Sequence, residues 1–277
     1  MTRLLAMRRA QRILLLLLTT LVLAALSALA YGPLIPWSPI HPGYQELTLS
    51  RSRVLYPVNS TLPEAYRNAD TWIREAERFY DVTAAKRVNI VLVHNWSDFR
   101  RFAPWTYSEI LGGASLVTGD AIYITPRVNT LKLDHAEFLR HEIAHSVLAQ
   151  NAPAFSTYWA VQHLSWFSDG LAVWFGGYRT FGTQAGYFAR ARSGAVASDI
   201  VQSQRVPDLR YGYVAWRNFM DYLDQTHGHA TFLAFVHDAN RDPRNVETLF
   251  RTHLGRSIRE ASSAFEAAVL SRSFTPR

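Results

Sequence analysis

The stretch Leu139–Leu148, LRHEIAHSVL, holds two histidines four positions apart, with a glutamate directly after the first. Residues four apart on a helix lie on nearly the same face, so the imidazoles of His141 and His145 can bind one metal ion together. Glu142 lies one position further round the helix, where its carboxylate can reach a water molecule on that ion. We therefore predict a metal site on a helix of about residues 133–149.

The chain has ten histidines, so two of them could lie four positions apart by chance. The rest of this helix argues against chance. Its other faces are apolar, which places the helix in the core. The apolar residues are Phe138, Leu139, Ile143, Ala144, Val147 and Leu148. The alternative is a pair of ordinary core histidines beside a buried carboxylate, which is costly because each group needs its own hydrogen-bond partner. The chain has no cysteine, so a metal must be held by His, Asp or Glu.

A third ligand is expected, because a catalytic zinc site uses three protein ligands and keeps one position for water. The extended pattern HExxHxxGxxH is absent, since Leu148 and Asn151 stand where it requires glycine and histidine. Asp169 is the best candidate. It lies 24 residues after His145, near the start of an apolar helical stretch.

Two alternatives to this ligand stay open. Asp169 could instead be a helix N-cap, with its carboxylate bonded to the backbone N–H of Leu171 or Ala172. His163 is the rival ligand, although a surface histidine bonded to a neighbouring carbonyl explains it more simply.

The stretches LRHEIAH (139–145) and WFSDGLAVWF (166–175) together resemble the gluzincin zinc peptidases. The likeness is greatest to the small peptidase MA-like (minigluzincin-like) group, whose second motif reads roughly W-[LF]-x-E-G-x-A. It covers most of residues 55–255. The segment from GGAS to AIYITP (112–126) looks like the substrate-side edge strand of that group.

The resemblance implies a Zn²⁺ ion held by His141, His145 and Asp169, with Glu142 as general base. The chain departs from the group's pattern at Asp169, where glutamate is usual. Aspartate is one methylene shorter, so its helix must approach the metal about 1 Å more closely, or the metal site is weakened.

The resemblance also implies a donor to the reaction's oxyanion, often a tyrosine or histidine from a later helix. In RYGYVAWRNFMDYL (210–223), Tyr213 has the family-like spacing to the residues that follow it. Tyr211 is the alternative donor. Either tyrosine could also be an ordinary core residue of an amphipathic helix.

The N-terminal segment contains an uncharged apolar run, residues 13–30, that is just long enough to cross a bilayer as a helix. Four arginines precede it and should stay in the cytoplasm, which places the rest of the chain on the other side. The prediction is a single-pass anchor in the cell membrane with an extracytoplasmic domain. The alternative is a signal peptide cleaved after Ala30, since residues 28–30 read Ala-Leu-Ala, which would give a secreted protein.

The chain divides into an anchor (1–31), a proline-rich linker (32–55) and a zinc metallopeptidase-like domain (56–277). Residues 32–45 hold four prolines and two glycines, a composition typical of an extended spacer. The remaining elements predict an α+β fold, with a small, mainly antiparallel sheet packed on the HExxH helix and a mostly helical C-terminal half. They are strands at 88–93 and 121–126, helices within 62–80, 165–177 and 210–228, and a last helix pair within 229–270.

The predicted function is a membrane-anchored zinc peptidase acting on peptide or protein substrates. Nucleic acid is not expected as a partner, because four of the seven net positive charges come from arginines in the first 30 residues, which leaves +3 for the rest. Two alternatives are a catalytically silent interaction domain and an amidase acting on cell-wall material. The intact Glu142 argues against the silent domain, which needs no base. The oligomeric state is not predicted.

Overall fold

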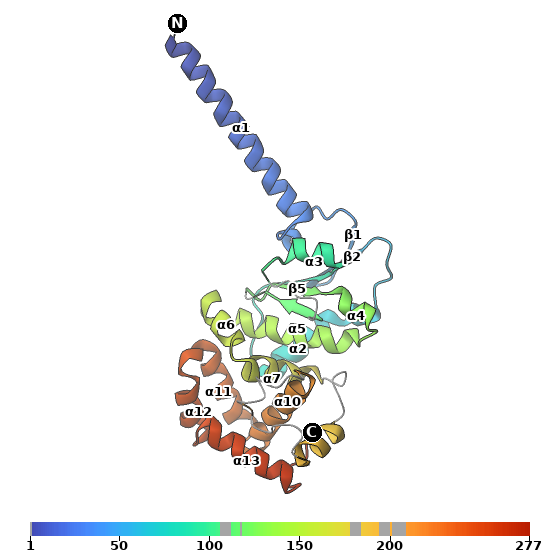
Figure 1. Cartoon of the computed structure of the whole chain (residues 1–277), viewed down its shortest axis with the longest axis vertical. Helices are drawn as coiled ribbons and strands as arrows, with labels where there is room; N and C mark the ends of the chain where they lie inside the picture. Colours follow the sequence, from blue (N-terminus) through green and yellow to red (C-terminus); the bar gives the residue numbers. More distant parts are fainter. Residues whose placement is uncertain (1, 106–111, 117, 178–183, 194–199, 201–208) are drawn as a thin grey trace.

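The computed structural model describes residues 2–105, 112–116, 118–177, 184–193, 200 and 209–277 (Figure 1). Helix α1 (Thr2–Tyr31) projects alone from the body of the molecule (Figure 1). Its part Gln11–Tyr31 has the length and hydropathy of a membrane span, and its most apolar window is not buried against any described residue. A membrane anchor and a signal sequence both fit such a helix.

The proline-rich segment after α1 packs onto the body, so the prediction that residues 32–45 form an extended spacer was wrong. A short 3-10 helix, η1 (Ile35–Trp37), follows α1 closely, and its Ile35 is fully buried. The guanidinium of Arg53 donates a hydrogen bond to the carbonyl of Ser38 at 3.1 Å. The segment is proline-rich, but an apolar side chain that reaches the core and a partly buried hydrogen bond hold it in place.

The sheet has five strands in the order β1-β2-β3-β5-β4. The strands are β1 (Tyr44–Thr48), β2 (Ser52–Pro57), β3 (Val88–Leu92), β4 (Gly113–Ser115) and β5 (Ala121–Ile124). The pairs β1–β2 and β4–β5 are antiparallel, whereas β2–β3 and β3–β5 are parallel. The predicted mainly antiparallel sheet is therefore a mixed sheet. Strands β1 and β2 also lie almost entirely within the range 32–55, which the sequence had assigned to a linker.

The parallel pairing of β2 and β3 follows from the helical segment between them, since parallel strands need a crossover. That segment contains η2 (Glu64–Asn68) and α2 (Ala69–Tyr80). Side chains alternate across the sheet. Val54, Ile90 and Ile122 join the core shared with α2 and α5 (His135–Gln150), whereas Leu55, Val91 and Tyr123 join a second core with Ile35 and with α3 (Trp96–Phe102).

The C-terminal half is helical in the part that the structure describes. After the short α4 (Pro126–Thr130) and after α5 come α6 (Phe155–Gln162), α7 (Ser165–Gly176), α8 (Gln184–Arg192), α10 (Leu209–His227), α11 (His229–Arg241), η3 (Pro243–Asn245), α12 (Val246–Leu254) and α13 (Ile258–Leu270). The expected last helix pair is three helices, because Gly255 ends α12 in a left-handed conformation and Ser257 caps α13. Figure 1 shows α1, α3, the sheet, α5 and then the C-terminal helices along the long axis.

The turn between β4 and β5 is held on the motif helix α5 by Gly119. Its φ is +70°, and the side-chain amide of Gln150 donates to its carbonyl at 2.7 Å. The hydroxyl of Ser146 donates to the same carbonyl. A Cβ at this position would lie 2.6 Å from the backbone oxygen of Ser146, so the turn backbone rests directly on the helix.

We predict that Gly119→Ala lowers the free energy of unfolding by about 2 kcal/mol or more, because left-handed strain and a backbone clash act together. The matched control is Gly255→Ala, since Gly255 has a φ of +71° but no atom within 4 Å of an added Cβ. Its expected loss is about 1 kcal/mol from strain alone. Urea unfolding of both variants measures the difference, and equal losses would contradict the close contact at Gly119.

Candidate metal centre

Helix α5 brings the two histidines of the motif together. The helix begins at His135, where the side chain of Asp134 caps it by accepting the N–H of Ala136 at 2.8 Å. The Nε2 atoms of His141 and His145 lie 3.1 Å apart, and both side chains are buried. The spacing of four therefore places both imidazoles at one point, as predicted.

Asp169 lies on α7 and faces these two nitrogens. Its Oδ1 is 3.4 Å from Nε2 of His145 and 4.0 Å from Nε2 of His141. The alternative that Asp169 is an N-cap was wrong, because α7 begins at Ser165 with Leu164 in the cap position. About a quarter of the Asp169 side chain is exposed (26%), so this side of the cluster is open to solvent.

Helix α7 packs closely on both of its neighbours through small residues. A Cβ added at Gly176 would lie 3.5 Å from the backbone nitrogen of His141, so the backbones of α7 and α5 nearly touch. A Cβ at Gly170 would lie 2.9 Å from Cε of Met220 on α10. This packing provides the close approach that the shorter aspartate side chain requires.

The three donor atoms fit a tetrahedral zinc ion. Bonds of about 2.0–2.2 Å place the ligand atoms of such a site about 3.3–3.5 Å from one another. The observed separations of 3.1, 3.4 and 4.0 Å scatter around this value. Two imidazole nitrogens and one carboxylate oxygen are also a donor set that zinc accepts. His141, His145 and Asp169 are thus able to hold the ion.

Glu142 is buried beside this cluster, under strand β4. Burial raises the pKa of its carboxyl group to about 7, although the neighbouring His145 and hydrogen bonds from Ser115 oppose the shift. A Cβ at Gly113 would lie 2.7 Å from Oε1 of Glu142, so the edge strand passes directly over the carboxyl group. A group with this pKa can both accept and return a proton near neutral pH.

Two hydroxyl groups hold the far side of the His145 ring. Nδ1 of His145 lies 3.2 Å from the hydroxyl of Tyr158 on α6 and 3.3 Å from Oγ of Ser168 on α7. A hydrogen bond at Nδ1 fixes the ring orientation and leaves Nε2 for the metal. Sequence reasoning missed both residues. Ser168 could have been found from its place beside Asp169, whereas Tyr158 carries no local signal.

The structure also distinguishes the two candidate tyrosines from each other and places the rival ligand His163. The ring of Tyr213 lies edge-on to His141 with centroids 6.0 Å apart, and the charge of Asp169 raises the pKa of Tyr213 well above its usual value. The ring of Tyr211 instead stacks with Arg190, whose guanidinium lies 3.9 Å from the ring centre. His163 is bonded to the carbonyl of Trp159 at 2.7 Å and is outside the metal cluster.

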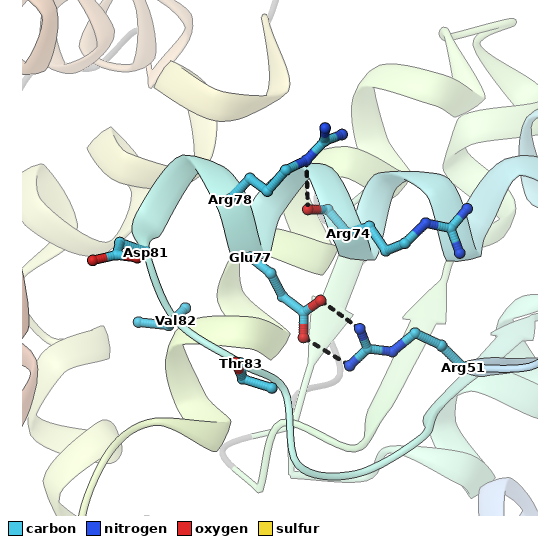
Figure 2. A pocket seen from close by; sticks show the side chains of 7 residues that line it. All are labelled: Arg51, Arg74, Glu77, Arg78, Asp81, Val82 and Thr83. Atoms are coloured by element: carbon cyan, nitrogen blue, oxygen red, sulfur yellow. Dashed lines mark hydrogen bonds and ion pairs between the residues drawn. The ribbon is translucent and has the colours of Figure 1, made fainter.

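A concave region near the end of α2 contains none of the metal-cluster residues His141, His145 and Asp169. It is lined by Arg51, Arg74, Glu77, Arg78, Asp81, Val82 and Thr83 (Figure 2). Figure 2 shows the guanidinium of Arg51 paired through two hydrogen bonds with the carboxylate of Glu77. This pairing neutralises both charges, and the region lacks a metal-binding donor set.

Comparison with known proteins gives structural neighbours but no family. No protein-family model matches the chain, and no curated protein is similar to it. A solved structure of a mutant M1 zinc metallopeptidase from Deinococcus radiodurans, bound to a Tyr-Ser-Ala substrate, is 17% identical over 84% of this chain and 52% of that chain, with a TM-score of 0.46. A second structure of the mutant M1 zinc metallopeptidase from Deinococcus radiodurans has a TM-score of 0.45, at the same identity and coverage.

A third neighbour is a mutant two-domain M1 zinc metallopeptidase bound to L-arginine, 14% identical over 80% of this chain and 50% of that chain, with a TM-score of 0.44. The chain spans about half the length of these neighbours. All three are zinc metallopeptidases, but with scores below 0.5 the similarity does not assign a family.

We predict that Tyr158→Phe combined with Ser168→Ala weakens zinc binding about 10- to 100-fold, because the Nδ1 position of His145 loses both partners. Competition with a zinc chelator measures the affinity. The matched control is Tyr187→Phe, which removes another buried tyrosine hydroxyl, on α8. Unchanged affinity in the double variant would show that the two hydroxyls do not orient the histidine.

Proposed function

We propose that the protein is a membrane-anchored, zinc-dependent peptidase of the minigluzincin-like group, with its domain outside the cytoplasm. The observation that carries this proposal is the convergence of His141, His145 and Asp169 beside the buried carboxyl group of Glu142. A zinc ion bound there would lower the pKa of a water molecule towards about 7 and polarise a substrate carbonyl.

Glu142 is the general base of the proposed reaction. Its carboxylate accepts the proton of the attacking water and returns it to the leaving amine as the peptide bond breaks. Burial raises the pKa of this carboxyl group above its usual value, which makes the carboxylate a stronger base. Ser115 and the backbone over Gly113 keep the carboxyl group in place.

Tyr213 is the proposed donor to the oxyanion. Its ring lies beside His141, and its raised pKa keeps the hydroxyl protonated so that it can donate a hydrogen bond. The stacking of Tyr211 on Arg190 favours Tyr213 over the alternative.

A peptide is the substrate that the sheet favours. In the described part of the chain, β4 pairs only with β5 and is the last strand on its side of the sheet. An extended peptide can add to such an edge through backbone hydrogen bonds. The strand passes over Glu142, so an added peptide would lie next to the proposed catalytic groups. This favours peptidase activity over the alternative of an amidase.

We expect Glu142→Gln to keep the zinc. The rate of peptide hydrolysis should fall about 10²- to 10⁴-fold, because the amide cannot accept a proton. The full chain in detergent is the material, since Ile35 belongs to the core and truncation after it removes a core residue. Elemental analysis and a fluorogenic peptide assay are the measurements. Glu64→Gln, at an exposed carboxylate, is the control, and full activity in Glu142→Gln would contradict the role of the base.

We expect Asp169→Ala to lose most of the bound zinc, because two imidazoles alone form an incomplete site. His163→Ala, which changes the rival ligand, should keep about one zinc per chain. Elemental analysis after dialysis against a weak chelator compares the two. Zinc retained in Asp169→Ala but lost in His163→Ala would reverse the assignment of the third ligand.

A further inference from the structure

The junction between α1 and the body is short and firmly packed. The N–H of Leu34 donates to the carbonyl of Ala28 at 3.2 Å, so the chain turns off the helix end at once. Ile35 is then fully buried in the core beneath α3. Four residues after the last residue of α1, the chain is already part of the body. The body therefore cannot move far from the end of α1.

Beyond the last residue of α1, three large apolar side chains remain exposed at this junction. They are Leu34 (43% exposed), Trp37 (39%) and Ile40 (53%). The indole nitrogen of Trp37 donates to Asp120 at 3.3 Å, which holds the ring with much of its apolar surface outward. Residues 31–45 contain no Asp, Glu, Lys or Arg. The junction thus presents apolar side chains on a segment without charged residues of its own, beside the ion pair of Asp120 and Lys86.

The position of this surface along the chain identifies what covers it. The apolar side chains of α1 from Ile13 to Leu26 are exposed and have no partner in the described residues, so burying them requires a bilayer. Ile40 lies nine positions after Tyr31, the last residue of that helix, and three of the eight residues between them form η1. The headgroup layer extends about 5–7 Å beyond the hydrocarbon core on each side. Side chains this close in sequence to the end of the span are able to reach that layer, where tryptophan and tyrosine are enriched.

We propose that Leu34, Trp37 and Ile40 form a lipid-facing patch that rests in the headgroup layer of the membrane crossed by α1. This inference depends on the membrane anchor in the proposed function and is independent of the zinc site. Ile35, between two residues of the patch, packs with α3 on one side of the sheet, and α5 lies on the other side. The patch therefore keeps the metal centre on the side of the sheet away from the bilayer.

The test uses the absence of cysteine, since every engineered cysteine is then unique. Ile40→Cys and Trp37→Cys probe the patch. Leu131→Cys and Leu270→Cys are controls, because both native side chains are exposed to a similar extent (50% and 48%) but lie outside the junction. Each variant of the full chain carries a nitroxide label in phosphatidylcholine vesicles. Electron paramagnetic resonance then measures collision with oxygen, which concentrates in lipid, and with a water-soluble nickel chelate.

The expected result is an oxygen-to-nickel ratio several-fold higher at positions 37 and 40 than at positions 131 and 270. Equal ratios at all four positions in vesicle-bound protein would overturn the patch while leaving the anchor intact. Protein that does not remain with the vesicles would overturn both. Protection at positions 37 and 40 that persists in detergent and depends on protein concentration would assign the surface to a second copy of the chain and overturn the lipid contact. None of these outcomes depends on zinc or on peptide hydrolysis.

Discussion

The structure depends on the convergence of three polar side chains at the contact between α5 and α7. The Nε2 atoms of His141 and His145 lie 3.1 Å apart, and Asp169 faces both. Burial and the neighbouring imidazole lower the pKa of His141 well below its usual value. Burial also lowers the pKa of His145, but Asp169 and Glu142 outweigh it and raise that pKa. A divalent cation satisfies both rings and the carboxylate at once, which is why metal binding and folding are coupled in such sites.

Close backbone contacts make this convergence possible. Gly176 lets α7 approach α5, Gly113 lets the edge strand lie on Glu142, and Gly119 seats the turn after that strand. The site is thus built from a helix pair and one sheet edge that share a single core helix. The elements η1 and α3 pack on the opposite face of the sheet, and the metal cluster found among the described residues includes none of their side chains.

The sequence predicted the local features of the site well. The spacing of His141 and His145 placed two nitrogens at one point, and Asp169 lies where the resemblance placed the third donor. The roles of these residues, of Glu142 and of Tyr213 remain predictions. Tyr158 was missed because it reaches His145 from another helix, and only the packing of α6 reveals that contact.

The larger errors concern long-range pairing. Strand β2 pairs with β3 in parallel because α2 crosses between them, and no local pattern reports the direction of a partner strand. Proline content suggested a free spacer at residues 32–45, but Ile35 enters the core. Proline content indicates which backbone conformations a segment favours. It does not show whether one of the side chains, here that of Ile35, is buried.

The most direct test of the central claim is a crystal structure of the full chain with anomalous scattering recorded on both sides of the zinc edge. We predict one zinc peak that lies about 2.0–2.2 Å from Nε2 of His141, from Nε2 of His145 and from a carboxylate oxygen of Asp169. A folded protein with a zinc peak bound by other residues, or with no peak after growth in zinc, would contradict it.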